Sequence, residues 1–134
     1  MNADLRRDEL TLSGMMKILI VDDEPGIVMS LEFLMKKEGY QVYIARDGAE
    51  ALDIIHQEQP QLVLLDIMMP SVDGYEVCRQ VKGSDLLRQT KIVFLSAKSK
   101  ESDIEKGLSY GADLYLTKPF STRNLMAKVQ ELTA

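Results

Sequence analysis

Residues 62–70 read LVLLDIMMP, and this stretch determines the expected fold. Four consecutive apolar residues lead directly into Asp66, without the alternation of a half-exposed strand. A short, continuous apolar run is typical of a strand buried on both faces of a parallel sheet. Burying a carboxylate beside such a strand costs several kcal/mol unless it is compensated. The stretch therefore predicts a parallel sheet with a compensated acid at one strand end.

Four other runs share this texture: KILIV at 17–21, QVYIA at 41–45, KIVFLS at 91–96 and LYLT at 114–117. Apolar residues spaced three and four apart lie between and after them, which predicts helices over 25–38, 48–58, 73–82, 100–110 and from Ser121 to Leu132. Five β-α units predict an α/β fold, a doubly wound (βα)5 sheet of five parallel strands in the order 2-1-3-4-5. A β/α barrel would need eight units.

Composition limits the class of protein. The chain has 134 residues, enough for one domain, and a net charge of −5, which argues against direct binding of nucleic acid. Its one cysteine, Cys78, excludes a disulfide within the chain and is expected to be buried in a helix. No apolar stretch approaches the length of a membrane span, and the N-terminus lacks the apolar core of a signal peptide, so we expect a cytoplasmic protein without a membrane partner.

The chain divides into two parts. Residues 1–15 are charged and weakly patterned, and are expected to form a flexible extension whose role the sequence does not reveal. Residues 16–134 are expected to form the folded domain.

Polar residues follow four of the predicted strands. Asp22 and Asp23 follow the first, Asp66 the third, Ser96 ends the fourth, and Lys118 follows the fifth. In the order 2-1-3-4-5 these strands are contiguous, and their carboxyl ends form the usual ligand site of an open α/β sheet. Three carboxylates about 5 Å apart cost on the order of 10 kcal/mol before compensation. Lys118 and a divalent cation would supply it, and oxygen-only ligands favour Mg²⁺ or Mn²⁺ over zinc.

The same arrangement suggests a reaction. Asp66 is held by a rigid strand, and a carboxylate beside a cation can attack a phosphoryl group to give an aspartyl-phosphate. Such a transfer needs mainly positioning and neutralisation of charge on the phosphoryl oxygens. We therefore hypothesise that Asp66 is a phosphoacceptor.

The sequence resembles a receiver domain of bacterial two-component response regulators, similar to the chemotaxis regulators with a flavodoxin-like fold. The resemblance covers Lys17 to Leu132 and rests on ILIVDDE at 18–24, ARDGAEAL at 45–52, LVLLDIMMPSVDGYE at 62–76, FLSAK at 94–98 and GADLYLTKPF at 111–120. It implies that Asp66 is the phosphoacceptor and that Lys118 contacts the phosphate. It also implies that Asp23 binds Mg²⁺ directly, Asp22 binds it through water, and the main-chain carbonyl of Met68 is a further ligand.

The resemblance also implies a conformational switch. Ser96 resembles the hydroxyl that moves to the phosphoryl oxygen, and Tyr115 the aromatic residue that turns inward after it. Gly74 resembles the glycine that lets the loop after Asp66 reverse. The bond from Lys118 to Pro119 is expected to be cis.

The implied partners are a sensor histidine kinase or a phosphotransfer protein, which supplies the phosphoryl group. The face formed by 100–110, 114–117 and the last helix would then control an output domain or a downstream protein, or form a homodimer. Leu114 stands where dimerising relatives have an acid, which argues against that dimer. The domain would assist only its own phosphotransfer and dephosphorylation, and Met68 and Lys98 are expected to slow the latter. The sequence does not identify the kinase, the signal, the output or the phosphoryl lifetime.

Two alternatives stay open. A phosphatase with an aspartate nucleophile would also place an Asp after a strand, but it needs a second acid where Met68 stands. An interaction module that is not phosphorylated would be expected to have lost the acid pair, Asp66 or Lys118, and all are present. A P-loop is absent, and the acidic VDDEPG segment would repel a flavin phosphate.

Overall fold

The computed structural model describes residues 15–134, and most of the predicted N-terminal extension lies outside this range. Strands and helices alternate along the chain. In order they are β1 (Lys17–Val21), α2 (Pro25–Lys37), β2 (Gln41–Ala45), α3 (Gly48–Glu58), β3 (Leu62–Leu65), α4 (Gly74–Lys82), β4 (Lys91–Ser96), α5 (Glu101–Ser109), β5 (Leu114–Thr117) and α6 (Thr122–Thr133). All ten predicted elements are confirmed within one residue or so at each end.

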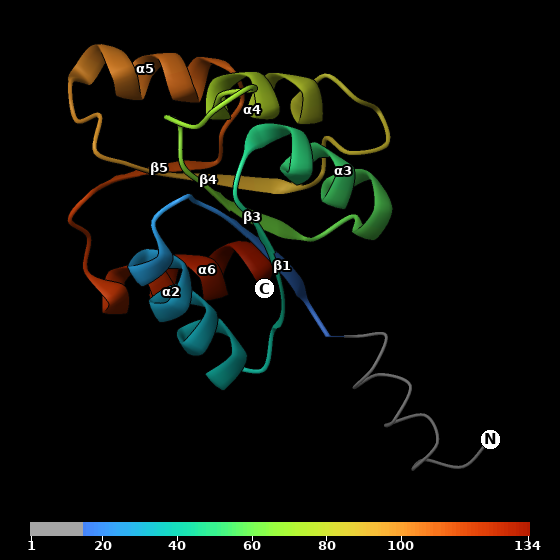
Figure 1. Ribbon diagram of the computed structural model, residues 1–134, viewed down its shortest axis with the longest axis vertical. Coiled ribbons are helices and arrows are strands. Elements are labelled where there is room, and N and C mark those ends of the chain that lie inside the picture. Colours follow the sequence, from blue (N-terminus) through green and yellow to red (C-terminus); the bar gives the residue numbers. More distant parts are fainter. Residues whose placement is uncertain (1–14) are drawn as a thin grey trace.

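The five strands form one parallel sheet in the order β2-β1-β3-β4-β5, which confirms the predicted fold. Helices α3, α4 and α5 cover one face of the sheet, and α2 and α6 cover the other (Figure 1). The loops that follow β1, β3, β4 and β5 gather at one edge of the sheet, on the left in Figure 1. Within residues 15–134, no helix combines the length and the apolar character needed to cross a membrane.

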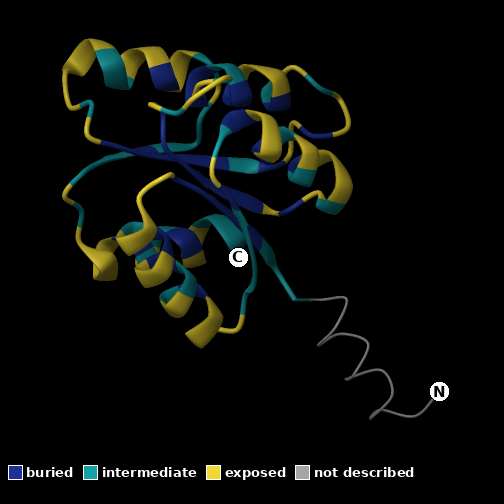
Figure 2. Cartoon of the chain, viewed as in Figure 1, coloured by how far each residue is buried: buried dark blue, intermediate teal, exposed yellow. Residues whose placement is uncertain are grey.

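The sheet separates two apolar cores (Figure 2). Every residue of β3 is buried, as are nearly all of β1 and β4, as their continuous apolar runs predict. The expectation of burial on both faces is wrong for β2 and β5, which are mostly half-buried. These two strands form the edges of the sheet, where the helices cover less of each face. Cys78 is buried in α4, as predicted.

Helix α5 is buried at a glycine and not at Ile104 and Leu108, the apolar residues that lie four apart in it. Leu108 is 45% exposed and Ile104 is half-buried, whereas the buried residue of this helix is Gly107. A Cβ at Gly107 would lie 3.0 Å from ring atoms of Phe94 and of Tyr115. The helix backbone therefore rests directly on two aromatic rings, and this contact turns Leu108 toward solvent.

The loop between β3 and α4 reverses tightly at Gly74. The Gly74 N–H donates to the Ile67 carbonyl at 2.9 Å, and a Cβ at this position would overlap the main-chain carbonyl oxygen of Asp66. Asp73 caps the helix, because its side chain accepts from the Glu76 N–H at 2.9 Å. The absence of a side chain at Gly74 thus allows α4 to start directly behind Asp66.

Replacing Gly74 by alanine should lower the free energy of unfolding by about 1–3 kcal/mol, since the added methyl group overlaps main-chain atoms that cannot rotate away. Urea denaturation would measure the change. Gly26→Ala is the matched control: it also lies in the first turn of a helix, but a Cβ there meets nothing within 4 Å. We expect the control to be neutral or stabilising by about 0.5 kcal/mol. Equal losses in both variants would contradict the role of Gly74.

Candidate functional site

Asp66 lies one residue beyond β3 and is only 7% exposed. Its N–H donates to the Val21 carbonyl at 2.9 Å, and its own Oδ1 accepts from the Ile67 N–H at 2.8 Å. Burial raises the pKa of Asp66 from its ordinary 3.8 to about 6, opposed by the charge of Lys118 and assisted by that of Asp22. The neighbouring backbone thus fixes this carboxylate in a place where its charge is costly.

Asp22 and Asp23 follow β1, the strand that pairs with β3. Asp22 is 2% exposed and accepts from the Glu24 N–H at 2.9 Å, whereas Asp23 is exposed. One carboxylate oxygen from each of Asp22, Asp23 and Asp66 lies within 4.8 Å of the others. The structure therefore brings together the three acids that the strand ends predicted.

Lys118 lies at the same edge, after β5, with its side chain 12% exposed. Its Nζ is 2.8 Å from Asp22 Oδ2 and 3.8 Å from Asp66 Oδ2. Burial lowers the pKa of Lys118, but the hydrogen bond to Asp22 and the charge of Asp66 outweigh it, and the net pKa is raised. The lysine is a permanent cation that offsets part of the carboxylate charge. The peptide bond between Lys118 and Pro119 is cis, as predicted.

Ser96 ends β4, between the strands that carry Asp66 and Lys118. It is 1% exposed, and its Oγ accepts from the Lys98 N–H at 3.1 Å. Tyr115 of β5 is 9% exposed, and its hydroxyl donates to the Lys98 carbonyl at 2.6 Å. The hydroxyl of Ser96 and the inward ring of Tyr115 are thus joined through one loop residue.

The donor set fits a hard divalent cation. The three acids offer oxygen ligands alone at close spacing, which suits Mg²⁺ or Mn²⁺. Within the described part of the chain, this is the acidic cluster whose geometry could hold a metal ion. The one histidine, His56, lies on the exposed side of α3, away from this edge.

The chain matches the model of a protein family described as "Response regulator receiver domain" over residues 18–130. The chain belongs to this family. Receiver domains are signalling domains of two-component systems and interact with histidine kinases or phosphotransfer proteins.

Solved structures similar to this chain are receiver domains as well. The signal receiver domain of a signal transduction histidine kinase from Syntrophus aciditrophicus is 35% identical, with a TM-score of 0.80 over 87% of this chain and 88% of that one. A CheY-like receiver domain protein from Methanospirillum hungatei is 32% identical, with a TM-score of 0.82 over 89% and 94%. The BeF3-activated N-terminal receiver domain of RstA from Klebsiella pneumoniae is 31% identical, with a TM-score of 0.81 over 88% and 99%.

The residues directly after Asp66 line an open hollow of about 520 Å³ in this receiver domain. Met68 and Lys98 line it together with Tyr75 and Lys106. The Met68 side chain is 63% exposed. The two residues that are expected to slow dephosphorylation therefore line the same hollow. Their effect on dephosphorylation, and the metal contact of the Met68 carbonyl, stay predictions.

Sequence reasoning missed two contacts of this site. Glu24 Oε1 lies 3.5 Å from Lys118 Nζ, so a fourth, exposed acid shares the lysine. Its position directly after the Asp22–Asp23 pair was the available signal. Tyr75, which reads as an ordinary packing residue, lines the hollow and lies 7% exposed at the start of α4. Nothing in the spacing of residues indicates this contact, which depends on how α5 packs.

The raised pKa of Asp66 predicts how stability depends on pH. A carboxyl whose pKa is higher in the folded state stabilises that state below its ordinary pKa of 3.8, and this stabilisation is lost as pH rises to about 6. In protein stripped of metal by a chelator, Asp66→Asn should therefore be more stable than wild type at pH 7, by on the order of 2–3 kcal/mol. The two should converge near pH 4.

Urea denaturation of both proteins across this range measures the difference. Adding Mg²⁺ at pH 7 should stabilise the wild type more than Asp66→Asn, because the variant removes one of the three carboxylates. If the difference in the free energy of unfolding between wild type and Asp66→Asn does not change with pH, the raised pKa of Asp66 is contradicted.

Proposed function

We propose that this receiver domain accepts a phosphoryl group on Asp66 from a partner histidine kinase or phosphotransfer protein. The observation that carries the proposal is the convergence of Asp66, Lys118 and two further acids at adjacent strand ends. In the transfer, an Asp66 oxygen attacks phosphorus, and the bond from phosphorus to the donor breaks, its electron pair leaving with the donor. The product is an aspartyl-phosphate, which water later hydrolyses.

Asp22, Asp23, Asp66 and the main-chain carbonyl of Met68 would hold Mg²⁺ or Mn²⁺. The ion, when bound, would neutralise charge on the phosphoryl oxygens. Lys118 supplies a second positive charge, and its contacts with Asp22 and Asp66 hold its ammonium group at this edge of the sheet. The buried backbone around Asp66 keeps the attacking oxygen in place.

Phosphorylation adds about two negative charges, which favour the arrangement with Ser96 drawn toward the phosphoryl group. Ser96 Oγ and the Tyr115 hydroxyl are bound to the same loop residue, Lys98, so movement of this loop reaches both. The surface of α5, β5 and α6 would change with them and act on a downstream protein or an output domain. We place this signalling in the cytoplasm, where the single, buried Cys78 thiol is suited to reducing conditions.

The alternatives are weaker. A phosphatase needs a general acid two residues beyond its nucleophile, and the exposed thioether of Met68 cannot donate a proton. An interaction module without phosphorylation would gain nothing from burying Asp66 and raising its pKa to about 6. A homodimer through α5, β5 and α6 is a weaker proposal, because Leu114 is half-buried and offers no charge to a partner.

Incubation with acetyl phosphate and Mg²⁺ should add one phosphoryl group to the wild-type chain, and intact-mass spectrometry would detect it. Asp66→Asn should add none, and chelation with EDTA should abolish incorporation into the wild type. Asp73→Asn is the matched control, because Asp73 lies seven residues on and serves to cap α4. Incorporation into Asp66→Asn equal to that in the wild type would contradict the proposal.

Met68→Asn should shorten the lifetime of the phosphorylated form several-fold, because a small polar side chain at the edge of the hollow can orient water where methionine excludes it. The decay of phosphorylated protein after removal of acetyl phosphate measures this. Met69→Asn, its neighbour in the same hollow, is the control. A decay unchanged from wild type would refute the role of Met68.

A further inference from the structure

Helix α5 is weakly anchored to the rest of the domain. Its one buried residue is Gly107, and glycine inside a helix makes that helix less stable than alanine would. Leu108 is 45% exposed, and Lys100 gives the helix no side-chain cap. An element with so little buried apolar surface belongs to the low-stability part of a structure. Individual contacts from neighbouring elements therefore decide where it lies.

Tyr75, in the first turn of α4, makes two such contacts. Its hydroxyl donates to the main-chain carbonyl of Asp103 at 3.2 Å, and the Lys106 ammonium lies 4.5 Å from the centre of its ring. Asp103 and Lys106 are one turn apart on α5. Burial raises the pKa of Tyr75 to about 12, so the hydroxyl keeps its proton and donates at neutral pH. A single residue of α4 thus binds α5 by its hydroxyl and by its ring.

Tyr75 is also connected to the loop after Asp66 and, through Phe94, to Tyr115. It directly follows Gly74, whose backbone packs against the Asp66 carbonyl. Its ring packs edge-on against Phe94, with centroids 5.7 Å apart, and Phe94 packs against Tyr115 at the same separation. Two steps therefore lead from the main chain of Asp66 through Tyr75 to α5, on a route that does not use Ser96.

We propose that Tyr75 is a positioning residue of the switch, which holds the first turn of α5 in the arrangement with Tyr115 inward and couples this helix to the loop after Asp66. The proposal rests on the proposed function, because it assigns a second route by which the phosphorylated site acts on α5. The proposed role is positioning alone, since the Tyr75 hydroxyl binds the Asp103 carbonyl and makes no hydrogen bond to Asp66 or to the other acids of the site.

The test is amide hydrogen exchange on the full chain, comparing wild type with Tyr75→Phe. This variant keeps the ring and removes the hydrogen bond to Asp103. Before phosphorylation, we expect amides of 101–109 to exchange about fivefold faster, the factor that one ordinary hydrogen bond supplies, with α2 unchanged. After treatment with acetyl phosphate and Mg²⁺, the change in α5 exchange should be smaller in the variant than in wild type.

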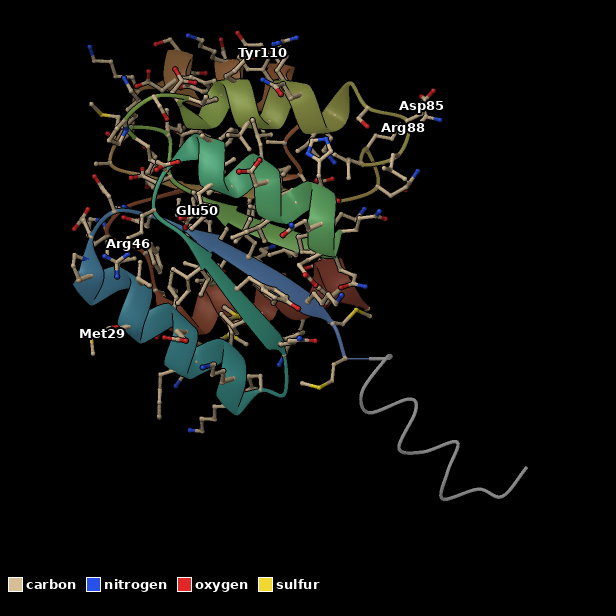
Figure 3. All side chains as sticks on the ribbon, turned by 45° about the vertical axis from the view of Figure 1, so that its right-hand side comes forward. Met29, Arg46, Glu50, Asp85, Arg88 and Tyr110 are labelled. Carbon is tan, nitrogen blue, oxygen red and sulfur yellow. The ribbon has the colours of Figure 1, made fainter. Side chains whose placement is uncertain are left out.

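Tyr110→Phe is the matched control. Tyr110 belongs to the same aromatic cluster, with its ring centroid 5.8 Å from that of Tyr75. It lies at the C-terminal end of α5 (Figure 3). Its hydroxyl makes no hydrogen bond to any residue of 15–134. This control should leave exchange in α5 as in wild type.

Three results would overturn the inference: equal exchange in Tyr75→Phe and Tyr110→Phe, faster exchange throughout the chain including α2, or an unchanged response to phosphorylation. The second would mean that Tyr75 only supports packing. Intact-mass spectrometry of the same samples reports separately whether Asp66 is phosphorylated. A wild type that takes up no phosphoryl group would refute the proposed function, while the comparison before phosphorylation would still decide whether Tyr75 holds α5.

Discussion

The ion pairs of Lys118 with Asp22 and Asp66 are the interactions on which the site depends. A parallel sheet forces the ends of neighbouring strands together, so the acids after β1 and β3 are crowded whatever their side chains prefer. One lysine cannot neutralise three carboxylates, and burial leaves Asp66 with a raised pKa. The domain thus gives up stability at this edge, and the proposed binding of a divalent cation would restore part of it.

The two layers of helices serve this site unequally. On one face, α2 and α6 bury regular apolar stripes against β1, β3 and β4, which fixes the sheet that carries Asp66 and Ser96. On the other face, α3 and α4 pack in the same way, but α5 rests on aromatic rings through a glycine. A conformational switch requires an element that can move at a small cost in free energy, next to elements that stay in place. Helix α5, which buries only Gly107, suits the first role, and α4, which buries several side chains, suits the second.

Much of this could be predicted from the sequence because the decisive signals are local. Continuous apolar runs identify the strands, and polar residues stand at the ends of four of them, so Asp66, Lys118 and Ser96 could be placed at one edge of the sheet from the sequence. The errors have tertiary causes: β2 and β5 lose cover at the edges of the sheet, and Gly107 rather than Leu108 faces the core. The contact of Tyr75 with Asp103 joins segments far apart in the chain, and no spacing of residues encodes it.

Gly107 places the backbone of α5 in direct contact with two aromatic rings. A side chain at that position could change rotamer and absorb a shift of Phe94 or Tyr115, whereas the backbone of α5 touches these rings directly. Packed interiors do not deform continuously, so a ring that moves must displace the helix or be held back by it. The proposed route through Ser96 and Tyr115 and the proposed route through Gly74 and Tyr75 meet at Phe94. On the proposed mechanism, a disturbance at Asp66 would therefore reach the same glycine of α5 from two sides.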